Sequence, residues 1–504
     1  MRHFKSRSEL QSVVNGGLSA MKLRVNHVTE YRSGIDRHDA YQNSIYLPFE
    51  ILSKIFIDCL RSDRFQKPQP NVNIAPLLLC RICQHWRYVA IATPQLWVNL
   101  QIRLRIVSQS PQLHNNNPIL PEEFAFIDNW VAHARPYPPS FYIAKYRIRF
   151  KREIPENFTS FEDFYTSPPI RSSRSLELEL SRNDFRAICV SKTPFKNLEY
   201  LIMVGTLEDD GPPSSTSFKF PPSPLLRRLH LDCGFSESTH KISRTFPLVS
   251  LTHLCIERDI NDGKWLELLE QSPNLQYGIF KLWGRFAPSR KTTKHVLHNH
   301  MRQMILQCTR YDGLPATFEG LLFPMMQSLR QAIPYECLPG SNITTEDLQA
   351  ILESTPALTE FHIQSCVEVS HSADSSNQTR KSLSSYVPNI KVLVIDKINN
   401  IISSRHIIPF LQSDWLREGW SSAFRIRVEI ILIALRHFFS SAAAFRAIID
   451  HVNNLCGEEH DDDNSLEVVL RQENEAQWEW TNSSSRDMRD RWHERMKFYH
   501  GVGG

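Results

Sequence analysis

The sequence has too few cysteines, too widely scattered, to form a disulfide-stapled fold. Its 504 residues include ten cysteines without a paired spacing pattern. Secreted scaffolds instead concentrate their cysteines in a short chain. We therefore interpret these cysteines as reduced thiols of an intracellular protein, cytoplasmic or nuclear.

Long apolar runs are also absent. The longest purely aliphatic run, Ile430 to Leu435, is far shorter than the ~20 residues that a membrane-spanning helix needs. No apolar segment follows the basic residues at the N-terminus. The sequence therefore predicts no membrane partner.

An excess of one charge sign is lacking as well. Lys and Arg total 58 and Asp and Glu total 54, so the formal net charge is only +4. Proteins that bind nucleic acid usually carry a larger basic excess. One short basic stretch with an aromatic residue, Arg486 to Lys497, leaves nucleic-acid binding as a weaker alternative.

The chain contains no motif for catalysis or nucleotide binding. We find no phosphate-binding G-x-x-x-x-G-K-[ST], no G-x-G-x-x-G, no G-x-S-x-G and no H-E-x-x-H. Hydrophobic residues at 41% are typical of globular proteins. We therefore expect a folded protein that is not an enzyme and uses no cofactor.

Three groups of residues have some features of a metal site. Cys80 and Cys83, with His85 nearby, have C-x-x-C spacing, but no second pair follows, and an apolar helical stripe accounts for them. The histidines within 295–300 lack a carboxylate at a defined spacing, so we expect an exposed turn there. The run Glu458 to Asp463 lacks the glycine and terminal Glu of a calcium loop. We expect no metal ligands.

Two helical patterns occupy the region from Tyr46 to Leu100. The first follows Pro48, a residue favoured at helix starts, and has apolar residues at 51, 52, 55, 56 and 59. The second runs from Ala75 to Ala90, with apolar residues at 79, 82, 83, 86 and 89. These spacings predict a small helical module.

Together with a closing T-P-x-L-W-x-x-L, the segments L-P-x-E-I-L-x-x-I-F and P-L-L-L-C-x-x-C-x-x-W-R-x-V-A resemble the F-box module, especially the variant common in fungal F-box proteins. The resemblance implies a three-helix unit that docks on the small Skp-type adaptor of a cullin–RING ubiquitin ligase. The docking residues it implies are Leu47, Pro48, Ile51, Leu52, Ile55, Leu79, Val89 and Trp97. Alternatively, these residues form only an internal helical core.

The rest of the chain contains internal repeats. Apolar residues recur at positions i, i+3 and i+5 in seven copies, although the copy at Leu275 has Gly278 in its second position. The first four copies are 28, 25 and 24 residues apart, within the range of about 20–29 residues of leucine-rich repeats. The copies begin at Leu198, Leu226, Leu251, Leu275, Met301, Leu358 and Ile390.

Each copy predicts a short strand whose apolar face points into a stacked core, with helices beginning at Asp262 and Thr344. Strands over 425–435 and 466–470, with a helix over 442–452, would form a C-terminal cap. The predicted fold class is α/β, a small N-terminal helical F-box-like module followed by an irregular leucine-rich-repeat-like solenoid. The predicted divisions are an extension with a short amphipathic helix (1–45), the helical module (46–100), the solenoid with its cap (101–480) and a flexible tail (481–504).

Residues that alternate with the buried leucines would line one exposed face of the sheet. Their mixed aromatic and charged character suits protein recognition. The candidate target-binding residues are Tyr200, Arg228, His230, Asp232, His253, Glu257, Tyr277, Lys281, Glu360 and His362. A solvent-facing sheet would also be polar without any such role, and that alternative stays open.

These features predict a substrate-recognition adaptor that links an unidentified target protein to a cullin–RING ligase through the Skp-type adaptor. The alternative is a non-catalytic leucine-rich-repeat scaffold without a ubiquitin link, in which the helical module only caps the solenoid. The exposure of four side chains distinguishes the adaptor from the scaffold. In an adaptor, an uncovered apolar patch would be formed by Leu47, Ile51, Ile55 and Trp97.

Overall fold

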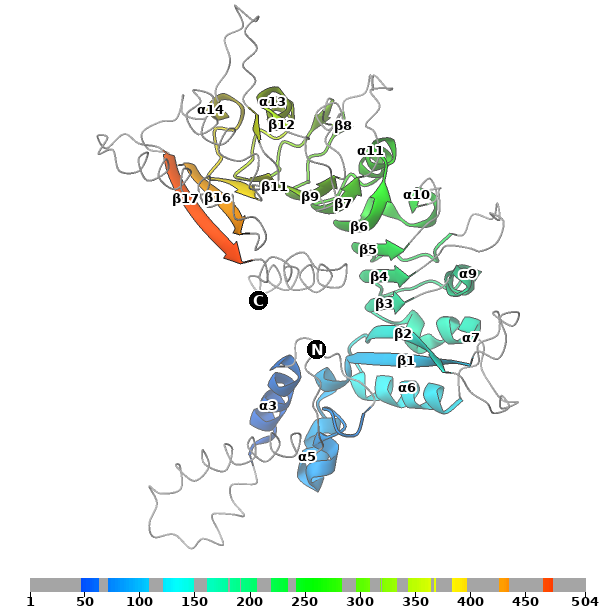
Figure 1. Cartoon of the computed structure of the whole chain (residues 1–504). Helices are drawn as coiled ribbons and strands as arrows, with labels where there is room; N and C mark the ends of the chain where they lie inside the picture. Colours follow the sequence, from blue (N-terminus) through cyan, green and yellow to red (C-terminus); the bar gives the residue numbers. More distant parts are fainter. Residues whose placement is uncertain are drawn as a thin grey trace, which may run out of the picture. The chain divides into compact units, whose positions relative to one another are not determined.

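A computed structural model of the chain describes part of its length (Figure 1). The predictions for 1–45, for 442–452, for Glu458 to Asp463 and for the tail from 481 lie outside the described residues. The chain divides into two compact units, Met1–Trp97 and Val98–Gly504. The described residues are 47–62, 71–107, 121–148, 161–179, 182–190, 192–205, 219–233, 242–282, 296–308, 318, 320–332, 343–363, 367–368, 383–396, 426–434 and 466–474.

The first unit is helical. Its elements are α3 (Phe49–Ser62), α4 (Leu79–Ile82), α5 (Gln84–Ile91) and the 3-10 helix η1 (Pro94–Trp97). The predicted helix start at Pro48 is confirmed, since the Leu52 N–H donates to the Pro48 carbonyl at 3.0 Å. Pro48 lacks a backbone N–H, but the N–H groups at a helix start make no intrahelical hydrogen bond, so none is lost.

The sequence predicts one helix for the second pattern, but the structure has two, α4 and α5. Cys83 interrupts it with an extended backbone, φ −157° and ψ 172°. The Cys83 sulfur then accepts the Trp86 N–H at 3.4 Å and caps α5. Cys83 thus satisfies an N-terminal amide of the helix, which apolar periodicity alone does not reveal.

In the described part of the second unit, thirteen strands form one sheet. Every pairing is parallel and the strand order follows the chain order (Figure 1). The fold is therefore mixed α/β with a parallel sheet. The strands are β1 (Asn99–Val107), β2 (Ser140–Ile148), β3 (Ser175–Glu179), β4 (Tyr200–Gly205), β5 (Arg228–Cys233), β6 (His253–Ile260), β7 (Tyr277–Leu282), β9 (Gln303–Cys308), β11 (Ser328–Ala332), β13 (Glu360–Ile363), β15 (Val392–Asp396), β16 (Ile426–Ala434) and β17 (Leu466–Asn474).

Shorter elements connect these strands. Two small parallel pairs join β8 (Val296–Leu297) to β10 (Leu321–Leu322) and β12 (Ile343–Thr344) to β14 (Val367–Glu368). Helices α9, α10, α11 and α13 lie on the same side of the row of strands (Figure 1). The helices are α6 (Pro121–Ala134), α7 (Phe161–Thr166), α8 (Pro168–Arg171), α9 (Arg182–Val190), α10 (Ile242–Thr245), η3 (Leu248–Ser250), α11 (Asp262–Gln271), α13 (Thr345–Glu353) and α14 (Leu383–Tyr386).

The predicted apolar repeat positions form the core. The first residue of all seven copies is fully buried, and the second residues are register partners across the sheet. An eighth copy, Met326 and Leu329, was missed because its third position is Gln331. It makes the later copies 25, 32 and 32 residues apart, from Met301 to Ile390.

A repeated backbone pattern joins the copies. The Arg227 carbonyl accepts N–H bonds from both Thr252 and His253, at 2.8 and 3.0 Å. The Thr252 carbonyl does the same for Gln276 and Tyr277 in the next copy. This arrangement satisfies the backbone groups at the start of each strand and fixes the register.

Both predicted helices form, with one correction. The cap of α11 is Asn261 and not Asp262, because the Asn261 side chain accepts the Lys264 N–H at 3.0 Å. In α13, Leu348, Ile351 and Leu352 are buried, as the spacing predicts. None of the helices in the described ranges is long and apolar enough to cross a membrane.

His298 is buried, with 1% of its surface exposed, and not part of an exposed turn as expected. Its Nε2 lies 3.2 Å from the Leu269 carbonyl oxygen. Burial lowers the pKa of His298 from 6.5 and the charge of His300 acts in the same direction, while the carbonyls of Leu269 and Ser272 oppose them. The neutral imidazole is therefore the form that the folded chain favours.

This burial predicts a pH effect on stability. As the pH falls below 6.5, the unfolded chain binds a proton at His298 that the folded chain still excludes, so stability decreases. We expect His298→Asn to reduce the difference between the urea midpoints measured at about pH 7.5 and about pH 5.5. An unchanged difference in a folded variant would contradict this.

Candidate functional site

Helix α3 has one buried and one exposed apolar face. Leu52 and Phe56 are 1% and 0% exposed, whereas Ile51 and Ile55 on the other face are 49% and 41% exposed, and Leu47 and Phe49 at the start of the helix are 42% and 38% exposed. We call these exposed residues the α3 apolar surface: Leu47, Phe49, Ile51 and Ile55.

The buried face of α3 packs on the following helices. The rings of Phe56 and Trp86 are 5.0 Å apart between centroids. The Ser53 and Thr93 hydroxyls are 2.9 Å apart, which links α3 to the start of η1. The Trp97 indole N–H donates to the Ala90 carbonyl at 2.8 Å. The core therefore fixes the orientation of α3 within this unit.

The structure separates the eight implied docking residues into two groups. A side chain buried in the free chain cannot contact a partner without repacking, so half of the set is corrected from docking to core residues. Leu47, Pro48, Ile51 and Ile55 are exposed, while Leu52, Leu79, Val89 and Trp97 are 6% exposed or less.

The proposed target-binding face is only partly open. His230 and Asp232, expected to be exposed, are 0% and 9% exposed, and the side chain of Glu257 is 5% exposed. The other candidates are accessible: Tyr200, Arg228, His253, Tyr277, Lys281 and His362 are half-buried, and Glu360 is exposed.

One register row contains most of the accessible candidates. Tyr200, Arg228, His253 and Tyr277 are neighbours on four adjacent strands, β4 to β7. The rings of His253 and Tyr277 stack, with centroids 4.4 Å apart and planes 16° apart. Burial raises the pKa of Tyr200 well above 10.0, as do Glu177 and Cys255, while Arg228 opposes them. Tyr200 therefore stays neutral at physiological pH.

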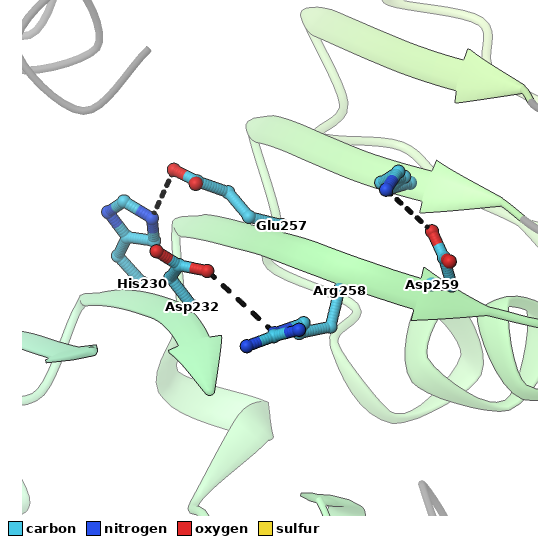
Figure 2. Close-up of polar contacts among 6 residues, drawn as sticks. His230, Asp232, Glu257, Arg258 and Asp259 are labelled. Carbon is cyan, nitrogen blue, oxygen red and sulfur yellow. Dashed lines mark ion pairs between the residues drawn. The ribbon is translucent and has the colours of Figure 1, made fainter. Parts of the chain in front are cut away.

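The buried candidates His230 and Glu257 form a cluster with Cys255, which is not among the predicted site residues. His230 on β5 is the register partner of Cys255 on β6, and His230 Nε2 lies 2.7 Å from Glu257 Oε1 (Figure 2). His230 and Cys255 occupy the i+4 position of neighbouring copies, beginning at Leu226 and Leu251. Superimposing the repeats would therefore have placed them side by side.

Two further salt bridges join residues of β5, β6 and β7. The Asp232 carboxylate lies 3.9 Å from Arg258 Nε (Figure 2). Lys281 Nζ lies 2.9 Å from Asp259. The β6–β7 register shifts between Ile256 and Asp259, so Glu257 and Arg258 have no partner residue on β7.

Neither a protein-family model nor a curated protein sequence matches the chain.

Proposed function

We propose that the protein is an F-box-type substrate-recognition adaptor, which links a target protein to a cullin–RING ubiquitin ligase through a Skp-type adaptor. The observation that carries the proposal is the α3 apolar surface. Exposed large apolar side chains on one helix, Phe49, Ile51 and Ile55, with Leu47 just before it, favour an interaction site.

We further propose that the second unit is an irregular leucine-rich-repeat-like solenoid that recognises the target. Parallel strands in chain order, copies 24–32 residues apart and the repeated carbonyl pattern support this. The target would bind the accessible row of Tyr200, Arg228, His253 and Tyr277. Aromatic and arginine side chains are enriched at protein interfaces.

The adaptor would act through proximity. By its resemblance to F-box proteins, the chain would contribute no reacting group, and the ligase would supply ubiquitin transfer. Holding the target near the charged conjugating enzyme raises its effective concentration. Geometry between the docking surface and the target face would then determine which lysines are modified.

Binding of the purified Skp-type adaptor to the full-length chain tests the proposal. We expect Ile51→Asp to weaken binding by roughly thirtyfold or more, because a buried interface residue is worth about 2 kcal/mol and the new charge would be desolvated. The double variant Leu47→Ala/Pro48→Ala should also bind more weakly. Surface plasmon resonance would measure both.

Val249→Asp is the matched control. Val249 is 64% exposed and belongs to the second unit, so the same substitution adds a surface charge outside the helical unit. It should bind like the wild type. If the folded wild-type chain does not bind the adaptor at all, a repeat scaffold without a ubiquitin link becomes the better account.

A further inference from the structure

A set of three metal-binding residue types is brought together by the pairing of β5 with β6. Among the described residues, His230, Cys255 and Glu257 are the group of three or more such residues whose ligand atoms lie within 4.8 Å of one another. His230 and Cys255 face each other across the strand pair, and Glu257 follows two residues later. Each residue comes from a strand, so the backbone positions are firmly held.

The spacing is close to what a tetrahedral ion requires. Zinc–nitrogen and zinc–sulfur bonds of about 2.0 and 2.3 Å place neighbouring donors roughly 3.3–3.8 Å apart. The Nε2 of His230 and the Oε1 of Glu257 are closer than this, and all three ligand atoms lie within 4.8 Å. Side-chain shifts of about 1 Å would therefore open the site around an ion.

Burial of the Glu257 carboxylate costs desolvation free energy when no cation is bound. The Oε2 atom of Glu257 is buried and has no hydrogen-bond partner among the described residues. An unpaired buried carboxylate oxygen carries a desolvation cost. Asp232, 9% exposed, adds a second carboxylate to the same region. A divalent ion would satisfy the orphaned oxygen of Glu257.

We propose that His230, Cys255 and Glu257 bind a zinc-class divalent transition metal, which cross-links neighbouring strands of the sheet. The donor set of imidazole, thiolate and carboxylate selects such an ion over calcium or magnesium, which prefer oxygen alone. The fourth position is open to Asp232 or to water. This inference does not depend on the proposed ubiquitin-adaptor function.

Cobalt(II) titration of the metal-free full-length chain tests the site, because a Co²⁺–thiolate bond gives a charge-transfer absorption. We expect the folded wild type to bind one equivalent with this absorption, and Cys255→Ser to lose it. Glu257→Gln keeps the side-chain shape and should weaken Co²⁺ binding at least about tenfold. Circular dichroism would verify that each variant is folded.

Two controls separate this site from the other cysteines. Cys233→Ser removes another buried thiol of β5, and Cys80→Ser/Cys83→Ser removes the C-x-x-C pair; both should keep the absorption. The proposal is overturned if the wild type shows no Co²⁺–thiolate absorption, or if Cys255→Ser retains it. Unchanged Co²⁺ affinity in folded Glu257→Gln would also overturn it, even if Cys255→Ser does not fold.

Discussion

Replacing Phe56 with alanine is expected to destabilise the N-terminal unit by about 3–5 kcal/mol. Phe56 is completely buried and its ring packs against Trp86. The substitution removes the transfer free energy of the ring and leaves a cavity between α3 and α5. Nearby helices can fill such a cavity only in part, because their positions are also set by the Ser53–Thr93 and Trp97–Ala90 contacts.

Hydrogen exchange of the α5 amides would measure this loss in the full-length chain. Opening of α5 should become more frequent by on the order of a hundredfold to several thousandfold. Ile55→Ala is the matched control, since Ile55 precedes Phe56 but is 41% exposed. Its effect on exchange should be small, although it should weaken adaptor binding. Similar exchange in both variants would show that the two faces of α3 are wrongly assigned.

Replacing Gly278 with leucine is expected to destabilise the second unit by about 3 kcal/mol, although it restores the apolar repeat pattern. A Cβ atom at Gly278 would lie only 2.5 Å from Cε2 of Phe280. The Phe280 ring is fully buried and packs against Trp265, with 6.2 Å between ring centroids. Phe280 therefore already fills the volume that a larger apolar residue occupies at this position in the other copies.

Urea unfolding of the full-length chain would measure this effect, and a rescue variant tests its cause. In Gly278→Leu/Phe280→Ala the aromatic ring is removed, so the new leucine has room. The double variant should be more stable than the sum of its two single substitutions predicts. A Gly278→Leu chain as stable as the wild type would refute the steric argument.

The spacing of apolar residues predicted most repeat copies and helices, but not the places where a copy or a helix departs from the pattern. The copies with all three apolar positions were visible, whereas Met326 and Leu329 were missed because Gln331 breaks the pattern. Apolar spacing also merged α4 and α5 into one helix. A residue such as Cys83 can satisfy the helical spacing and still cap the next helix with its side chain.

Exposure was harder to predict than the strands themselves. Alternation along β5 and β6 correctly separates Leu229 and Leu254 from His230, because side chains in a strand alternate between its faces. It wrongly implies that the second face is in water, since His230 is completely buried. Burial depends on what packs over a face, and alternation carries no information about that.

Local sequence patterns were sufficient to predict the α/β class, the helical module and most of the repeated strands. These follow from local properties: Pro48 begins a helix, and apolar residues at fixed spacing must be buried together. Only the folded structure shows which apolar residues of α3 are exposed, and that the cluster of His230, Cys255 and Glu257 is buried. Both depend on contacts between residues that are distant in the sequence, which strand register and helix packing establish only when the chain folds.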